Sequence, residues 1–404
     1  MDGSARPLSL FVGRHRELAT LRTTIHSAGQ RSSRQAVAGS PGVGKTTLVQ
    51  ELKGSLLGDG YLTTDAVVPV LAGDSAESLF ARVLSAIYET IVVNRPMSVH
   101  SKAMQDAQVV VRAERLGTGG GSVSVLGFGA GMTRGATVLS PKDILIDGPR
   151  ILRDLMLLVR ELDARGVILH LNNLENLSES SASRAAEVLR SLRDPMLMHD
   201  ALHVVMVGTT EAVNTVVNAH AQVRTVFGTL VLGPLEIREV HRMLAERYAH
   251  LALGDRQAVA PVTDDAVEAL YQLFGGDLRG LLKALEDGVT PLIGIAGTQP
   301  PAEPNPVRPL TIDELRPVLQ QRYAAHLASL PEQNRVQQLT RWGQTAPDEL
   351  YTQKSLKVLW NVSQPAVSGA LSFLTQQGYV VALPRNGAGP TQYALSGVSR
   401  LVFG

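Results

Sequence analysis

The sequence predicts an α/β fold built on a parallel sheet, followed by a helical region and a small C-terminal domain of the helix–turn–helix type. Three observations support this. Up to residue 233, short apolar runs such as Val167–Leu171 alternate with helix-length segments, as expected for strands buried on both faces of a parallel sheet. After Pro234 the apolar spacing is helical only. A proline-rich stretch, residues 297–311, then separates these helices from the rest of the chain.

The composition limits the possible classes of function. The chain has 404 residues, enough for two or three domains, and its 38 lysines and arginines nearly balance 37 acidic residues. Any nucleic-acid surface must therefore be local. Cysteine is absent, which excludes disulfides, zinc sites made of thiolates and cysteine nucleophiles. Because no apolar run approaches the roughly 18 residues of a membrane span, we expect a cytoplasmic protein without a membrane partner.

One eight-residue stretch carries the clearest chemistry. Gly39 to Thr46 reads Gly-Ser-Pro-Gly-Val-Gly-Lys-Thr, follows the apolar run Ala36–Ala38 and leads into a helix-competent segment. In this context, backbone N–H groups of the loop converge on a β-phosphate and the helix N-terminus adds partial positive charge. The sequence therefore predicts binding of ATP or ADP, with Lys45 at the β- and γ-phosphates and Thr46 as a ligand of Mg²⁺. The expected nucleotide contacts are Gly39, Pro41, Gly42, Val43, Gly44, Lys45, Thr46 and Thr47.

A second motif lies upstream of this loop. Phe11–Leu18 reads Phe-Val-Gly-Arg-His-Arg-Glu-Leu, which by itself indicates a glycine turn before an amphipathic helix. Together with the phosphate loop it resembles the entry of AAA+ and STAND ATPases, especially the origin-recognition (initiator-like) clade. The resemblance implies an AAA+ type P-loop NTPase with an all-α lid and a C-terminal winged helix. It also implies that Val12, Gly13 and Arg14 lie beside the adenine.

The region between the phosphate loop and residue 164 contains few chemical signals. Periodicity predicts one strand, 66–71, and three helices, 75–93, 98–116 and 147–164. Pro69 indicates that the strand is at an edge or ends there, and Asp74 or Ser75 is the expected cap of the first helix. A glycine-rich segment, residues 117–135, alternates serine and valine over part of its length. It is either an exposed insertion without a ligand or a loop that contacts a substrate or another subunit.

The strand Val167–Leu171 ends in a pair of amides, Asn172 and Asn173. By its position it is the counterpart of the Walker B strand, which in the resembled family ends in Asp-Asp or Asp-Glu. An amide can accept a hydrogen bond from a metal-bound water, so Asn172 is a candidate metal-site residue, but it is no general base at neutral pH. Glu175, the nearest carboxylate, is either the catalytic base or a surface residue at the start of the next helix. We therefore expect nucleotide binding with slow or partner-dependent hydrolysis.

Two further residues are candidate catalytic groups by resemblance. The strand Leu202–Gly208 ends at Thr209, the sensor 1 position of the AAA+ layout, where a hydroxyl contacts the γ-phosphate or the attacking water. Thr209 also suits the N-cap of the next helix. Arg224 precedes the expected strand 229–232, in the interval where relatives often place an arginine finger directed at a neighbouring subunit. The alternatives are a finger, which implies a homo-oligomer, and a solvated surface arginine.

A glycine turn opens one helix of the helical region. Gly275-Gly276-Asp277-Leu278-Arg279 resembles the sensor 2 motif of the initiator-like lid, and the resemblance implies that Arg279 reaches the γ-phosphate. The residues alone allow a simpler arrangement, in which Asp277 caps the helix and Arg279 forms an ion pair within its first turn.

The end of the chain predicts a winged helix-turn-helix. Residues 351–360 and 363–378 have the pattern of two helices, with Val358 and Leu359 packing on the second helix and Ser363 as its cap; strands at 379–383 and 392–395 follow. The second helix of such a domain enters the DNA major groove. The candidate DNA contacts are Gln364, Ser368 and Ser372 on this helix and Arg385 in the wing.

The expected domains are a nucleotide-binding base (residues 1–233), a helical lid (234–296), a linker (297–311) and the winged helix-turn-helix (312–404). The resemblance implies an ATP-binding switch whose nucleotide state controls DNA engagement or assembly. The alternative is a STAND-like signalling ATPase, for example in defence, whose winged helix docks a protein partner. A DNA motor with rapid turnover is a third possibility, and the Asn172-Asn173 pair argues against it.

Overall fold

The computed structural model describes residues 11–118, 141–174, 177, 179–251, 259–293, 308–383 and 389–403. The chain divides into two compact units. The sheet unit consists of Arg14–Gly39 and Lys45–Leu232. The helical unit consists of Gly233–Gly404 together with Ser40–Gly44 and the residues up to Gly13. The serine–valine alternation that begins at Ser122 and linker residues 297–307 lie outside the described residues.

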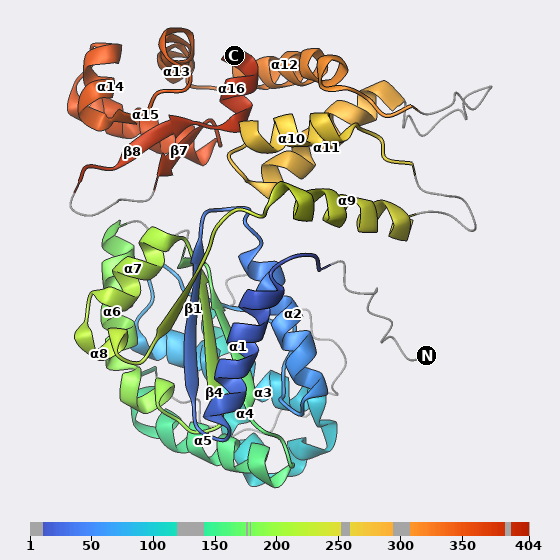
Figure 1. Ribbon diagram of the computed structural model, residues 1–404. Helices are drawn as coiled ribbons and strands as arrows, with labels where there is room; N and C mark the ends of the chain where they lie inside the picture. The colour runs from blue at the N-terminus through green and yellow to red at the C-terminus, as the bar shows by residue number, and fades with distance from the viewer. Residues whose placement is uncertain are drawn as a thin grey trace. The chain divides into compact units, whose positions relative to one another are not determined.

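Five parallel strands form the sheet, in the order β2-β3-β4-β1-β5. Strands β1 and β4 are labelled in Figure 1. Their bounds are β1 Ser33–Gly39, β2 Val68–Pro69, β3 Val167–Asn172, β4 Leu202–Gly208 and β5 Gly228–Leu232. β1 lies between β4 and β5, with Val37 opposite both Val207 and Leu230. Every residue of β4 is buried, as expected for a central strand of a parallel sheet. The predicted α/β class with a parallel sheet is confirmed.

The strand expected at 66–71 is much shorter in the structure. β2 comprises only Val68 and Pro69, and among the described strands it pairs with β3 alone. An edge position tolerates Pro69, which has no N–H to donate to a further strand. The proline therefore explains both the short length and the edge position.

The helices of the sheet unit follow the predicted order with shifted ends. Their bounds are α1 His15–Ala28, α2 Lys45–Gly58, α3 Ala76–Asn94, α4 Lys102–Thr118, α5 Pro141–Glu161, α6 Glu179–Ser191, α7 Thr210–Asn218 and α8 Ala221–Arg224, with short helical turns at Pro96–His100 (η1) and Arg193–Leu197 (η3). Ser75 caps α3 in a reciprocal capping box with Ser78. The expected helix 98–116 was wrong at its start, because η1 precedes α4. The expected start of α5 at Asp147 was also wrong, because the helix continues on both sides of Pro149.

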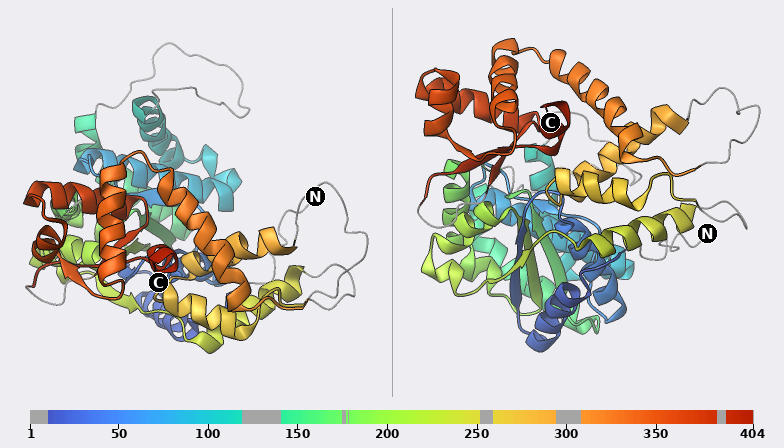
Figure 2. Two further views of the ribbon diagram at one scale, coloured as in Figure 1. Left: turned by 90° about the horizontal axis from the view of Figure 1, so that it is seen from above. Right: turned by 45° about the horizontal axis from the view of Figure 1, so that its top comes forward.

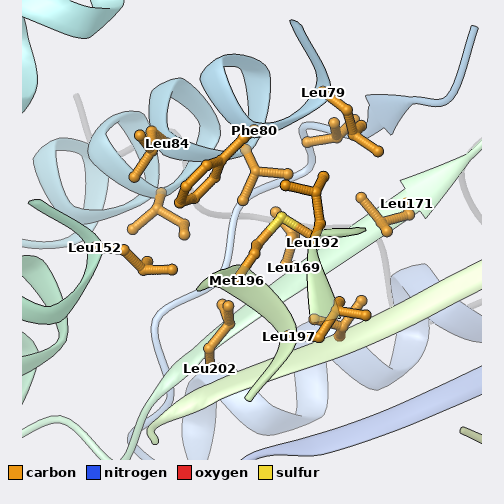
Figure 3. Close-up of a cluster of buried hydrophobic side chains, with 14 of the residues drawn as sticks. Leu79, Phe80, Leu84, Leu152, Leu169, Leu171, Leu192, Met196, Leu197 and Leu202 are labelled. Atoms are coloured by element: carbon orange, nitrogen blue, oxygen red, sulfur yellow. The ribbon is translucent and has the colours of Figure 1, made fainter. Parts of the chain in front are cut away.

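A contiguous apolar core packs on one face of the sheet (Figure 3). Phe80 and Leu84 come from α3, Leu152 from α5, and Leu169 and Leu171 from β3. Gly148 lets α5 approach α3 closely, since a Cβ at this position would lie 2.7 Å from the Phe80 ring. Successive side chains of a strand alternate between its two faces. Helices α3 and α5, which pack on Leu169 and Leu171, therefore cover the face of β3 opposite to His170 and Asn172.

His203 is expected to make the stability of the sheet unit depend on pH. It is fully buried on β4, and its Nδ1 lies 2.9 Å from the Ser33 hydroxyl. Burial, together with the positive charges of Arg34 and His26, lowers the pKa of His203 to about 4. The unfolded chain binds a proton here below about pH 6.5, whereas the folded chain does not. The free energy of unfolding should therefore fall between about pH 6.5 and 4, by up to roughly 1.4 kcal/mol per pH unit from this residue.

A His203→Asn variant tests this prediction. Asparagine keeps an acceptor near Ser33 and removes the titrating ring. Urea denaturation at several pH values from neutral to acidic should show a shallower fall of the unfolding free energy in the variant than in the wild type. Parallel curves for the two proteins would contradict the prediction.

The helical unit begins with helices packed around one core. Their bounds are α9 Ile237–Leu251, α10 Asp264–Leu273, α11 Leu278–Ile293 and α12 Ile312–Ala328. Leu270, Leu281 and Leu319 are fully buried in this core. The final helix, α16 Gly397–Phe403, was not predicted from the sequence and adds Leu401 to the same core. Helices α9 to α12 and the end of the chain are therefore parts of one packed body.

The C-terminal region combines helices with a small antiparallel sheet (Figure 2). Its elements are α13 Gln333–Thr345, β6 Tyr351–Thr352, α14 Gln353–Trp360, α15 Gln364–Gln376, β7 Val380–Leu383 and β8 Gln392–Leu395, and the sheet order is β6-β8-β7. α13 was not predicted. The expected packing of Val358 was wrong, since its side chain is 78 % exposed. Leu356 and Trp360 are buried instead, because they occupy the face of α14 opposite to Val358.

Within the described residues, no helix is both long enough and apolar enough to cross a membrane.

Candidate nucleotide-binding site

The phosphate loop connects β1 to α2, and two of its glycines have left-handed backbone conformations. Gly42 has φ 76° and Gly44 has φ 90°, values that glycine adopts without the strain other residues incur. α2 begins at Lys45, so the N–H groups of its first turn are directed toward the loop. The Lys45 side chain is buried, and its Nζ donates to the Gly39 carbonyl at 3.0 Å. This carbonyl holds the ammonium beside the loop.

Gly42 is in close contact with the start of α11. A Cβ built on Gly42 would lie 1.6 Å from Asp277 Oδ1 and 3.4 Å from the Arg279 amide nitrogen. The same Asp277 oxygen accepts a hydrogen bond from the Arg279 amide at 2.9 Å, which caps the helix. The start of α11 is therefore fitted against the loop at Gly42, a residue that lacks a side chain.

Arg279 follows this contact in the first turn of α11. Its side chain is exposed and forms no ion pair with another described residue. The expected cap by Asp277 is present, whereas the ion pair suggested as a simpler arrangement for Arg279 does not form within the described residues. The sensor 2 role of Arg279 stays a prediction.

Thr46 and Asn172 are the candidates for the metal site. Thr46 and its neighbour Thr47 are exposed in the first turn of α2. Asn172 ends β3, and its Oδ1 is buried without a hydrogen-bond partner within the described part of the chain. A buried acceptor without a partner is costly unless a donor such as a metal-bound water satisfies it. The chemistry of Thr46 and Asn172 thus fits Mg²⁺ held with water, although the described residues contain no cluster of three or more acidic or histidine side chains that could hold a metal.

The end of β3 has an unusual backbone. Asn173 has φ 78°, a left-handed conformation that asparagine tolerates better than most residues. Glu175, the expected candidate base, lies outside the described residues. The structure therefore describes an amide at both positions where the resembled family carries carboxylates.

Thr209 and Arg224 have ordinary structural positions. Thr209 caps α7, and its hydroxyl accepts from the Ala212 amide at 3.2 Å. Arg224 is the exposed last residue of α8. The cap accounts for the threonine without excluding a second contact of its hydroxyl. The catalytic roles of both residues stay predictions.

The three residues Val12, Gly13 and Arg14, expected beside the adenine, lie in a turn before α1. Val12 is 7 % exposed and belongs to the core that contains Leu235. Gly13 has φ 73°, and a Cβ there would lie 3.0 Å from the Leu235 side chain. Arg14 also has a left-handed backbone, with φ 58°, and its guanidinium lies 3.0 Å from Glu17. The motif forms a tight turn before α1, and its role at the adenine is untested.

The candidate DNA contacts on α15 share an exposed face. Gln364, Ser368 and Ser372 are all exposed and are spaced by four residues, so they align along one side of the helix. Ser363 precedes α15 at the N-cap position, but its side chain makes no capping hydrogen bond. Arg385 lies outside the described residues.

Two contacts of this region were missed by reasoning from the sequence. Gln364 Nε2 donates to Gln353 Oε1 at 2.9 Å, and Gln353 Nε2 donates to the Tyr393 hydroxyl at 3.3 Å. The close contact of Asp277 with Gly42 was also missed. All three contacts join different elements of the chain, so no local pattern indicates them.

No protein-family model matches the chain, and no curated protein matches it. Solved structures do match over most of its length. The Aeropyrum pernix ORC2 protein, solved as ADPNP–ADP complexes, is 17 % identical with a TM-score of 0.48, and the match covers 96 % of this chain and 92 % of that one. The Aeropyrum pernix ORC1 protein in complex with DNA is 17 % identical with a TM-score of 0.46, covering 98 % and 93 %. Drosophila ORC bound to DNA is 14 % identical with a TM-score of 0.42, covering 97 % and 86 %.

Proposed function

We propose that the chain is an ATP-binding switch of the origin-recognition AAA+ type, in which the bound nucleotide controls how the C-terminal winged helix engages DNA. Nucleotide binding rests on the phosphate loop, with Gly42 and Gly44 in left-handed conformations and Lys45 beside the loop. The sheet order, with the loop-bearing strand β1 between β4 and β5, provides the support for that loop.

The close contact between the start of α11 and Gly42 is the main support for a nucleotide-dependent switch. The Asp277 carboxylate stands where a side chain on Gly42 would be, next to the loop amides that are to receive phosphate. A bound phosphate and the Asp277 carboxylate are both negatively charged, so they would repel each other. Arrival of nucleotide therefore displaces Asp277, and with it the first turn of α11, and brings Arg279 into position to pair with the γ-phosphate. The proposed switch is thus a movement of the first turn of α11.

The residues described around the phosphate loop and at the end of β3 are suited to binding nucleotide rather than to hydrolysing it. Mg²⁺, when bound, neutralises phosphate charge, and Thr46 with Asn172 would hold it through its hydration shell. Neither Asn172 nor Asn173 can take a proton from the attacking water at neutral pH. We propose slow hydrolysis, or hydrolysis that needs a partner or Glu175, so that the bound state persists long enough to act as a signal.

Restoring carboxylates at the end of β3 should accelerate hydrolysis. A protein with both Asn172→Asp and Asn173→Asp is expected to hydrolyse ATP roughly 100-fold faster than the wild type, since a positioned base contributes about 10²- to 10⁴-fold. Aspartate is chosen at 173 because, like asparagine, it tolerates the left-handed backbone there. Phosphate release under saturating ATP measures the rate.

The control for this experiment is Glu175→Gln in both backgrounds. If the wild type already hydrolyses ATP briskly and Glu175→Gln abolishes that activity, then Glu175 is the base and turnover is not weak. Equal rates for the wild type and the double variant would also contradict the proposal that the two amides limit hydrolysis.

The protein-docking alternative has one observation in its favour. α15 carries no charged side chain from Gln364 to Gln376, and Val358 on α14 is largely exposed. DNA binding by the full chain at increasing salt separates the two functions. Contacts to phosphates weaken steadily as salt rises, so a salt-dependent affinity for duplex DNA supports the proposed function, whereas no measurable binding even at low salt favours a protein partner.

A further inference from the structure

Three polar side chains of the C-terminal region form a chain of hydrogen bonds that ends at the exposed start of α15. Gln364 is the first residue of α15, Gln353 is the first residue of α14, and Tyr393 lies in β8. Gln364 Nε2 donates to Gln353 Oε1 at 2.9 Å, and Gln353 Nε2 donates to Tyr393 Oη at 3.3 Å. Exposed glutamines lose considerable side-chain entropy when held in this way, so the arrangement restrains a residue that is otherwise mobile.

After it bonds to Gln353, the Gln364 amide still has one donor and one acceptor available. Its Nε2 carries two hydrogens, of which one is directed to Gln353, and its Oε1 is an acceptor. The carboxamide therefore presents one donor and one acceptor in a fixed plane. In the major groove, adenine alone presents an acceptor, N7, beside a donor, N6, whereas guanine presents two acceptors. A restrained glutamine amide is complementary to adenine.

The neighbouring positions of α15 cannot make this distinction. Ser368 and Ser372 share the exposed face, but a hydroxyl donates and accepts equally well. The remaining residues of the first two turns, from Pro365 to Leu371, have apolar side chains or none apart from Ser368. Gln364 is therefore the one side chain in the first two turns of α15 that can form a bidentate pair with a base.

We propose that Gln364 selects an adenine in the major groove and that Gln353, itself held by Tyr393, is the positioning residue for this contact. The inference rests on the proposed DNA-binding function and names the base that the winged helix prefers at one position. It assigns Gln353 no contact with DNA, because both ends of its amide are held, by Gln364 and Tyr393, and its side chain is half-buried.

The test uses the full-length chain with ATP and a pool of duplex DNA containing a randomised segment. Bound duplexes are recovered and sequenced for the wild type and for Gln364→Glu, Gln353→Met and Gln353→Glu. The wild type should select adenine at one position over the other bases by roughly 5- to 150-fold. Gln364→Glu should shift the preference at that position to cytosine, since a carboxylate accepts from cytosine N4.

The two Gln353 variants separate positioning from simple folding. Gln353→Met removes the acceptor for Gln364 and should reduce the adenine preference to a few-fold. Gln353→Glu keeps an acceptor for Gln364 Nε2 and should retain the preference, even though its negative charge weakens binding to every sequence. Thermal unfolding of each variant is expected to match the wild type, because Gln364 is exposed and Gln353 is only half-buried.

Failure of the inference differs from failure of the proposed function. If the wild type selects no sequence and binds no duplex at low salt, both the DNA-binding function and the adenine contact are overturned. If the wild type selects a sequence that Gln364→Glu leaves unchanged, the adenine contact is overturned while DNA binding stands. Loss of the preference in Gln353→Glu as well as in Gln353→Met overturns the positioning role.

Discussion

A Gly42→Ala substitution is expected to reduce nucleotide affinity by roughly 100-fold, equivalent to about 2.7 kcal/mol. Two costs add at this position. Alanine at φ 76° adopts a left-handed backbone that costs about 1–2 kcal/mol. Its methyl group would also stand 1.6 Å from Asp277 Oδ1, which would hold the start of α11 too far from the loop for Arg279 to reach the γ-phosphate. Titration of a fluorescent ATP analogue measures the loss.

Gly44→Ala is the matched control for this experiment. Gly44 has φ 90°, but no atom lies within 4 Å of a Cβ built there. Its alanine variant therefore incurs backbone strain without displacing α11, and its affinity should fall less. Combining Gly42→Ala with Asp277→Ala should recover part of the lost affinity by removing the obstructing carboxylate. Equal losses for Gly42→Ala and Gly44→Ala would show that the contact with α11 is irrelevant.

Replacing Lys45 by methionine is expected to abolish detectable nucleotide binding, with a loss of roughly 100- to 1,000-fold. Lys45 is buried, and its ammonium is held by the Gly39 carbonyl at 3.0 Å, from which it can transfer to a phosphate oxygen with little movement. Methionine preserves the length and packing of the side chain but removes the charge. Hydrogen bonds to charged groups contribute about 1.5–3 kcal/mol, and the unpaired phosphate adds a desolvation cost. Isothermal calorimetry with ATP measures the effect.

Lys53 offers a second lysine on the same helix for comparison. It is 2 % exposed, and its Nζ donates to the carbonyls of Thr64 and Ala66, both at 2.8 Å. Burial lowers the pKa of Lys53 to about 8. Lys53→Met should therefore lower the thermal stability of the protein while the folded molecules retain nucleotide affinity. Loss of affinity in Lys53→Met with unchanged stability would contradict this division between the two lysines.

The phosphate loop and the sheet were predictable because their signals are local. The glycine spacing of Gly39–Lys45 and the apolar runs of β3 and β4 depend on neighbouring residues, and both are in the structure where the sequence predicts them. Strand ends and helix starts were less predictable. The helix was expected to start at Asp147, yet α5 begins at Pro141 and continues across Pro149, where Gly148 lies close to the Phe80 ring.

The parts of the candidate site that depend on distant contacts could not be predicted. Asp277 was identified as a helix cap, but its position against Gly42 depends on how the lid helices pack and leaves no trace in either motif. The link from Gln364 through Gln353 to Tyr393 joins three elements in the same way. Val358 was assigned to the core because it is apolar, although the face of α14 that carries Leu356 and Trp360 excludes it.

The central claim, that nucleotide is reported to the C-terminal winged helix through α11, is tested most directly by DNA affinity with different nucleotides. Fluorescence anisotropy of a labelled duplex pool at low salt is measured for the full chain with ATP, with ADP and without nucleotide. We expect the wild type to bind DNA with affinities that differ by roughly 5- to 150-fold between ATP and ADP, the usual range of coupling between two sites. Arg279→Ala should still bind ATP but lose this difference, while Arg242→Ala, on the exposed side of α9, should keep it. Identical DNA affinities of the wild type with ATP and with ADP would contradict this coupling between nucleotide and DNA.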